Sequence, residues 1–184
     1  MKNIIKIITI IISLQLNAQT TTPVEQMMTF IRNNNEQNHY FKDVNGVFDK
    51  FIGNWKYETA TEKVELLIVK VEMVNGQNYY EDVINILFKY TKNNVVIFDT
   101  ISSNINYYIF GEGFWEIDNF NKHHFRYWEP NQDRFGIYQT VDIEYIPVNV
   151  GQPQLNWVAK YEPKDSYTAS PPEMPMNMVF TKLP

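Results

Sequence analysis

The stretch Phe51-Ile52-Gly53-Asn54-Trp55-Lys56-Tyr57 begins the first strong strand pattern of the chain. Gly53 marks a turn, and Trp55 follows it at the start of a segment rich in aromatic residues. From here to the C-terminus, short alternating segments are separated by turn residues, and no helical pattern intervenes. This arrangement predicts an all-β, antiparallel structure.

Two turns downstream of this stretch predict hairpins. Asn75-Gly76 lies between two alternating segments, which is the strongest short-range hairpin signal, and Lys92-Asn93-Asn94 marks the next turn. The alternation predicts that one face of the intervening strand is buried, with Tyr80, Ile84, Ile86, Phe88 and Tyr90 on it. We expect strands at 52–59, 62–74, 79–91, 95–102, 105–110, 114–118, 122–129, 135–148, 155–162 and 176–183.

Residues 1–19 have the pattern of a secretory signal peptide. Lys2 and Lys6 precede a short apolar core, and Asn17-Ala18-Gln19 supplies a cleavage site after Gln19 or Ala18. The apolar stretch is shorter than a membrane-spanning helix requires, and no Cys is present for lipid attachment. We therefore expect a secreted or periplasmic protein that is not a lipoprotein and has no stable membrane insertion after cleavage.

Residues 20–45 predict a short N-terminal helix followed by a polar linker. Thr22 has the character of an N-cap, Pro23 of the first helical residue and Glu25 of the acidic partner in a capping box. The helix would end in Asn33-Asn34-Asn35, and the chain stays polar as far as Asp43. Residues 46–184 then form a single β domain.

Composition limits the classes of function. The 184-residue chain has no Cys, so its stability cannot depend on disulfides. Its formal charge is −5, and removal of the two signal-peptide lysines makes it about −7. An acidic chain without a basic stripe is not expected to bind nucleic acid. Aromatic residues make up 15% of the sequence, which favours strands.

Gly53-Asn54-Trp55, preceded by a short helical turn, resembles the start of the lipocalin-like, or calycin, barrels. The resemblance implies an antiparallel barrel of about 8–10 strands whose Trp closes one end, with a basic residue of the last strand packed across the indole. Here these residues would be Trp55 and Lys182. The chain departs from the group because it lacks an evident second motif of the Thr-Asp-Tyr type, and the basic residue is Lys where Arg is more typical.

A second resemblance covers most of the mature chain. The segments Phe48–Tyr57, Tyr79–Asp82 and Met176–Lys182 are similar to a family of small exported bacterial proteins, a domain of unknown function. This resemblance supports the fold and the export, and it implies no activity.

The sequence shows no evident catalytic or metal-binding motif, so we expect neither an enzyme nor a metal or cofactor site. His123 and His124 are neighbours on a strand, so their rings point to opposite faces. A zinc site needs three or four ligands. The chain has no Gly-x-Ser-x-Gly motif. Alternation places most of the paired carboxylates, such as Glu81-Asp82 and Glu112 with Glu116, on solvated faces.

The sequence therefore predicts a protein that holds a small, largely apolar molecule inside a barrel. Inward residues of the two most regular strands would contact the ligand, and the loop at 163–175 would act as a lid. These residues are Ile84, Ile86, Phe88, Ile137, Val141 and Ile143. The alternative is an interaction module without a cavity that recognises carbohydrate or a protein through outward Tyr127, Trp128 and Tyr138. A connected interior void beyond ~300 Å³ would favour the first function.

Overall fold

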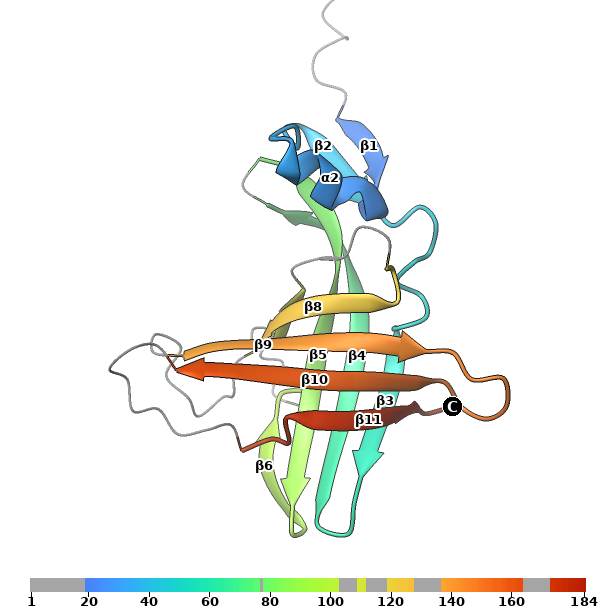
Figure 1. The fold of residues 1–184 in the computed structure, drawn as a ribbon, viewed down its shortest axis with the longest axis vertical. Helices are drawn as coiled ribbons and strands as arrows, with labels where there is room; N and C mark the ends of the chain where they lie inside the picture. Colours follow the sequence, from blue (N-terminus) through green and yellow to red (C-terminus); the bar gives the residue numbers. More distant parts are fainter. Residues whose placement is uncertain (1–18, 77, 103–108, 112–118, 128–136, 164–172) are drawn as a thin grey trace, which may run out of the picture.

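The protein is mainly β in a computed structural model that describes residues 19–76, 78–102, 109–111, 119–127, 137–163 and 173–184. Figure 1 shows the arrangement of its strands, its 3₁₀ turn and its short α-helix. Within the described ranges, no helix has the length and apolar character needed to cross a membrane. In chain order the elements are β1 (Thr20–Pro23), η1 (Val24–Gln26), α2 (Met27–Arg32), β2 (His39–Lys42), β3 (Gly53–Glu58), β4 (Glu62–Asn75), β5 (Tyr80–Lys92), β6 (Val95–Asp99), β7 (Ile109–Gly111), β8 (Lys122–Tyr127), β9 (Ile137–Ile146), β10 (Gln154–Pro163) and β11 (Asn177–Lys182).

The strands form one sheet in the order β1-β2-β5-β4-β3-β11-β10-β9-β8-β7, and β6 pairs with β5. Among the described strands from β3 onward, neighbouring strands pair in antiparallel fashion, which confirms the predicted antiparallel β structure. β5 also pairs with β7, but only through Asn85 and Phe110. This single pair of residues does not make the sheet a closed barrel.

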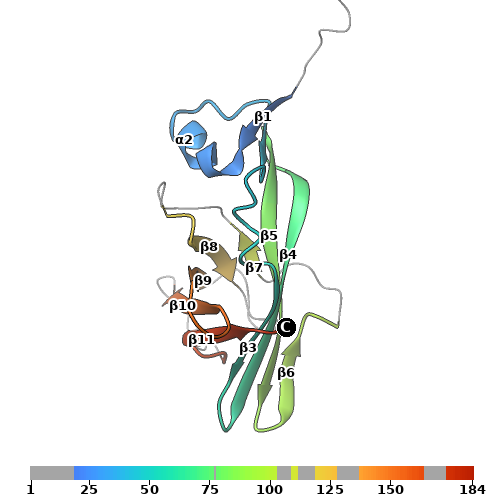
Figure 2. The same ribbon diagram turned by 90° about the vertical axis from the view of Figure 1, so that its right-hand side faces the viewer.

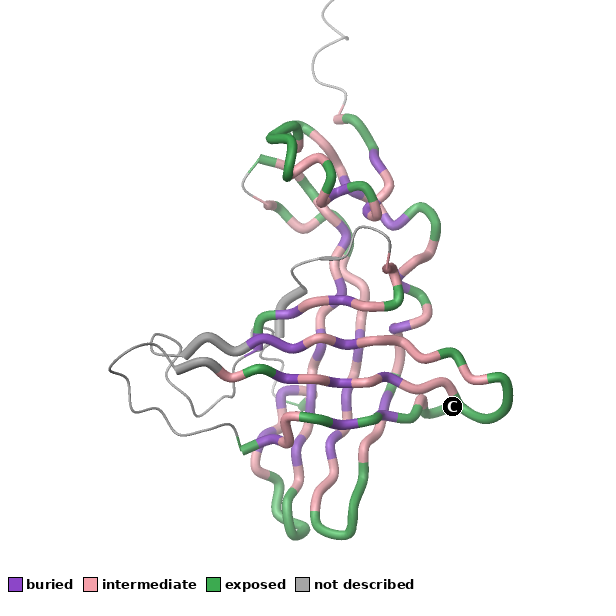
Figure 3. Tube along the Cα trace, viewed as in Figure 1, coloured by how far each residue is buried: buried purple, intermediate pink, exposed green. Residues whose placement is uncertain are grey.

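The sheet folds over on itself into two layers. In Figure 1, β8 to β11 run across β3, β4 and β5, and Figure 2 shows them on one side of these long strands. Buried residues of both layers belong to one hydrophobic core. Figure 3 shows buried positions alternating along the strands. The core therefore lies between the layers, and the outer face of each layer carries the polar side chains.

Regular alternation on β4 and β5 explains the register of the longest hairpin. Leu66 pairs with Phe88 and Ile68 with Ile86, and all four side chains are buried. The predicted buried face of this strand is confirmed at 84, 86, 88 and 90. Tyr80 was expected on the same face but is exposed, because the end of the hairpin extends beyond β8 (Figure 1).

The N-terminal segment differs from its prediction. Thr22 and Pro23 belong to strand β1, so a helix with Thr22 as N-cap is wrong. Helical structure begins only at Val24, and neither η1 nor α2 has a side-chain cap hydrogen bond. The expected polar linker contains strand β2, which pairs in parallel with β1 and with β5. Hydrogen bonds to two parallel strands that are distant in sequence hold this short segment as a strand, and its own residue pattern does not indicate these bonds.

Candidate functional site

The predicted ligand-contacting residues face the core. Ile84, Ile86 and Phe88 of β5 are buried, as are Val141 and Ile143 of β9, and all five belong to the core cluster. The sixth, Ile137, is the first residue of β9, and its side chain lies outside the described part of the structure. The two strands therefore contribute to one apolar interior.

Trp157 occupies the middle of this interior. Its backbone pairs with Ile143 of β9 and Met178 of β11. Its ring centre lies 5.7 Å from that of Tyr127, nearly edge-on, and 6.1 Å from that of Phe180. The side chain is 0% exposed, and its Nε1 has no hydrogen-bond acceptor within the described structure. A buried donor without an acceptor costs roughly 1–3 kcal/mol.

His123 is the buried imidazole of the interior. Its ring centre lies 4.6 Å from that of Phe125 and 5.7 Å from that of Phe48, and Phe51 is a third aromatic neighbour. Burial, together with the nearby charge of His124, lowers the pKa of His123 to about 3. The ring is therefore neutral at physiological pH, and it brings no positive charge into the interior.

Trp55 is fully buried in the core near the start of β3. Its Nε1 donates a 2.7 Å hydrogen bond to the carbonyl of Phe51, in the turn that precedes β3. Lys182 Nζ lies 5.2 Å from the centre of the Trp55 ring, the contact that the calycin resemblance implies. Gly53 has φ +125°, a backbone conformation that only glycine adopts readily. In the Gly53-Asn54-Trp55 motif, Gly53 therefore permits the turn, and Trp55 contacts both this turn and the ammonium group of Lys182.

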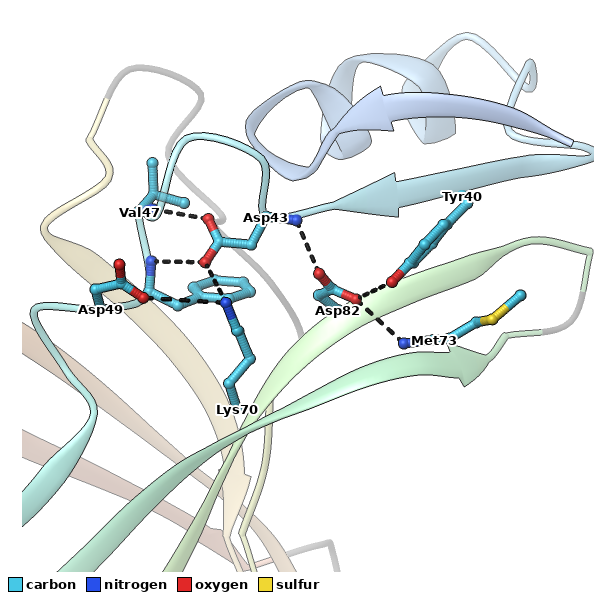
Figure 4. Close-up of polar contacts among 8 residues, drawn as sticks. Tyr40, Asp43, Val47, Asp49, Lys70, Met73 and Asp82 are labelled. Carbon is cyan, nitrogen blue, oxygen red and sulfur yellow. Dashed lines mark hydrogen bonds and ion pairs between the residues drawn. The ribbon is translucent and has the colours of Figure 1, made fainter.

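Asp82 forms the centre of a polar cluster where β2 meets the β4–β5 hairpin (Figure 4). The hydroxyl of Tyr40 donates to its Oδ1 at 2.6 Å, and the backbone N–H of Met73 donates to the same atom at 3.1 Å. Oδ2 accepts the backbone N–H of Asp43 at 2.9 Å. Met73 lies in a β-bulge, because both it and Glu72 stand opposite Asp82 alone. One buried carboxylate therefore joins three segments.

Asp43 continues the cluster into the turn before β3. Its Oδ1 accepts the N–H of Val47 at 2.7 Å, and its Oδ2 accepts the N–H of Phe48 at 3.4 Å. Lys70 Nζ lies 3.4 Å from Oδ2 of Asp43 and 4.0 Å from Oδ1 of Asp49 (Figure 4). This turn carries Phe48 into the core beside His123. Asp43 thus fixes the turn that leads into β3 and Trp55.

The hydrogen bonds of Asp43 and Asp82 connect parts of the fold to one another. Every oxygen of Asp43 and Asp82 accepts at least one hydrogen bond, so neither carboxylate has a free face for a substrate. Burial and the hydrogen bond to Asp82 raise the pKa of Tyr40 far above its ordinary value, which keeps its hydroxyl a donor. The sequence held one signal of this cluster that we did not use: Asp82 interrupts an otherwise apolar face of β5.

Glu81 lies beside this cluster, on β5. It pairs with Phe41 of β2 and Val74 of β4, and burial raises the pKa of its carboxyl to about 7. Most of the paired carboxylates were expected on solvated faces, and Asp82 is an exception because it is buried, whereas Glu81 is half-buried.

A second polar group lies on the outer face of β8 to β10. Asp142 Oδ1 lies 2.6 Å from His124 Nδ1, and its Oδ2 lies 3.5 Å from Lys122 Nζ and 3.7 Å from Lys160 Nζ. Partial burial would raise the pKa of Asp142, but the bond to His124 and the two lysines lower it overall. His123 faces the core while His124 faces outward, as the alternation predicts. The group is a network of ion pairs around one carboxylate.

The described residues line several surface pockets. One, of about 180 Å³, contains Asp142 and Glu144 of β9. Another, of about 270 Å³, lies between the outer face of β3 to β5 and residues 99–102, and it also reaches the core residues Trp55 and Leu66. Neither is lined by any of the predicted ligand-contacting residues.

The aromatic surface expected for an interaction module is not supported at Tyr127, which is 1% exposed and packs against Phe88 and Trp157. Its prediction as an outward residue is wrong, because it shares the inward face of β8 with His123 and Phe125. Trp128 and the side chain of Tyr138 lie outside the described residues, as do positions 164–172 of the predicted lid and 1–18 of the predicted signal peptide.

Comparison with known proteins gives a family but no activity. A model of a family of unknown function, DUF6705, matches residues 1–183. No curated protein and no solved structure matches the chain significantly. The function has to be argued from the residues of this chain.

Proposed function

The chain belongs to the DUF6705 family, whose function is unknown, and we propose that it is a secreted or periplasmic protein that holds a small, largely apolar molecule in the interior of a lipocalin-like barrel. Cleavage after Ala18 or Gln19 would leave every described element in the mature chain, because β1 begins at Thr20.

Barrel closure is part of this proposal. Starting from β5, the sheet order passes through β4, β3, β11, β10, β9 and β8 to β7, and the Asn85–Phe110 pair returns it to β5. The Trp55–Lys182 contact at one end of the interior supports the same architecture.

The observation that carries the proposal is the indole N–H of Trp157. It lies among aromatic side chains and has no acceptor within the described structure. Buried donors are almost always satisfied by protein or by an ordered molecule. A ligand whose acceptor atom approaches Nε1 would supply the missing bond and recover the cost of burying the N–H.

Ala159 offers a place for the body of such a ligand. It is the next inward residue on β10 after Trp157, and it is the smallest side chain in a core of large ones. A ligand that buries ~300 Å² of apolar surface would gain roughly 7 kcal/mol before the cost of association. This gain corresponds to weak or micromolar affinity, which the hydrogen bond to Trp157 would strengthen.

Native mass spectrometry of the mature protein, purified gently from the exported fraction of its host, tests the proposal. We expect an excess mass of a few hundred daltons that is lost on denaturation. Ala159→Phe should remove it by filling the space beside Trp157, whereas Val158→Phe, on the outer face, should retain it. A bare chain in the native spectrum, from a preparation kept free of detergent and organic solvent, would contradict the carrier function.

A further inference from the structure

The interior is poor in charge. In the described part of the chain, no lysine or arginine is buried. Among the described residues, the fully buried carboxylates are Asp43 and Asp82, which are held by hydrogen bonds at the junction with β2, and the half-buried Glu81 lies beside them. Lys182 stands over the Trp55 ring. The surroundings of Trp157 therefore contain no described buried cation to pair with an anionic ligand.

His123 does not change this conclusion. It is enclosed by Phe48, Phe51 and Phe125, and such a setting disfavours the charged imidazole. Its position within this aromatic group keeps it neutral, in line with the low pKa described above. An acidic ligand would have to bring a bare carboxylate into apolar surroundings, which costs far more than a single hydrogen bond returns.

The polar group of Trp157 itself is a pure donor, and it has no acceptor within the described structure. An indole N–H donates one hydrogen bond and accepts none. A hydrocarbon would leave Trp157 Nε1 unsatisfied, and an alcohol or amine would use only its acceptor capacity there. A carbonyl oxygen satisfies the donor without introducing a donor of its own or a charge.

We infer that the interior selects an uncharged molecule with an apolar body and a carbonyl-type acceptor, such as a ketone, ester or tertiary amide, and discriminates against free carboxylates. This inference rests on the proposed function, because it specifies the chemical class of the ligand held beside Trp157.

Three probes of matched size separate the alternatives: ethylbenzene, acetophenone and benzoate. Each is titrated at pH 8 into the ¹⁵N-labelled full mature chain, and two-dimensional NMR follows the indole N–H of Trp157, assigned by its absence in Trp157→Phe. We expect acetophenone to bind about tenfold more tightly than ethylbenzene, the gain of roughly one good hydrogen bond. The Trp157 indole proton should move downfield with acetophenone only, and benzoate should not shift the core resonances.

Two results would overturn the inference and leave the carrier function standing. One is tighter binding of benzoate than of acetophenone. The other is equal binding of ethylbenzene and acetophenone with an unmoved Trp157 indole resonance. If none of the three probes shifts the resonances of Ile143, Trp157 or Ala159, the proposed function fails and the inference fails with it. The affinities are measured on the unmodified chain, and Trp157→Phe serves only to assign the indole resonance.

Discussion

The hydroxyl of Tyr40 lies 2.6 Å from Oδ1 of Asp82, and this bond joins β2 to the longest hairpin of the molecule. Asp82 also accepts the N–H groups of Met73 and Asp43, so it satisfies a β-bulge and the turn after β2 together. In consequence, the N-terminal strands and the turn that leads to Trp55 depend on one buried carboxylate. The segment that leads into β3 is thus held in place by hydrogen bonds outside the apolar core cluster.

Replacement of Asp82 by Asn tests this dependence. The amide keeps the shape of the carboxylate but has only one acceptor oxygen, so at least one of the three donors loses its partner. We expect the free energy of unfolding to fall by about 2–4 kcal/mol. Urea denaturation measures this fall, and hydrogen exchange at the N–H groups of Asp43 and Met73 should become faster.

Tyr40→Phe is the matched control, because it removes one donor and leaves the two backbone bonds intact. Its cost should be smaller, about 1–2 kcal/mol, without faster exchange at Met73. If Asp82→Asn lay within 0.5 kcal/mol of the unmodified protein, the cluster would not hold the N-terminal segment.

Gly53→Ala tests the reason for glycine in the turn before Trp55. At φ +125° an alanine is strained, and its Cβ would lie 3.3 Å from Cε of Lys182. We expect a loss of about 1–3 kcal/mol, which thermal unfolding would record as a fall of the order of 2–10 °C in Tm. Asn54→Ala, at the exposed neighbouring position, should change Tm little. Equal Tm values for the two variants would show that the positive φ is not required.

The sequence predicted those parts of the fold that depend on local alternation. The segments on either side of Asn75-Gly76 form the expected hairpin, and Lys92-Asn93-Asn94 is followed by β6 as expected. At Asn93 and Asn94 the turn has φ of 50° and 63°, values that asparagine tolerates better than most residues. Side chains of a strand with one buried face alternate strictly, so the inward positions of β5 and β9 could be assigned without a structure.

Other features depend on contacts between distant segments and could not be predicted in this way. His39–Lys42 is too short and too polar to indicate a strand, and it forms β2 because β1 and β5 flank it in parallel. The burial of Asp82 depends on the same pairing, which brings Tyr40 and Asp43 to its carboxylate. Trp157 falls within the strand expected at 155–162, but its lack of an acceptor in the described structure depends on how the strands around it meet in space.

Glu81→Gln should change how stability depends on pH. The pKa of this carboxyl rises from 4.5 to about 7 on folding, so the unfolded chain loses the proton first. The contribution of Glu81 to the free energy of unfolding is fully present below pH 4.5, and it is lost as the pH rises towards 7. The variant should match the unmodified protein near pH 4 and exceed it by about 2–3 kcal/mol at pH 8. Urea unfolding across this range gives the difference; a constant difference at every pH would mean that Glu81 is solvated.

His123→Leu should have the opposite effect at acid pH. The folded chain holds His123 neutral down to about pH 3, whereas an unfolded histidine takes up a proton near 6.5, so the unmodified protein loses stability as the pH falls through this window. Leucine has a similar volume and no proton to bind. Relative to the unmodified chain, the variant should therefore gain about 2–3 kcal/mol between pH 8 and pH 4. His39→Gln, at a half-buried position outside the core, serves as the control. Parallel stability curves for His123→Leu and the unmodified protein would place a charged imidazole in the interior, and the preference for uncharged ligands would then lose its basis.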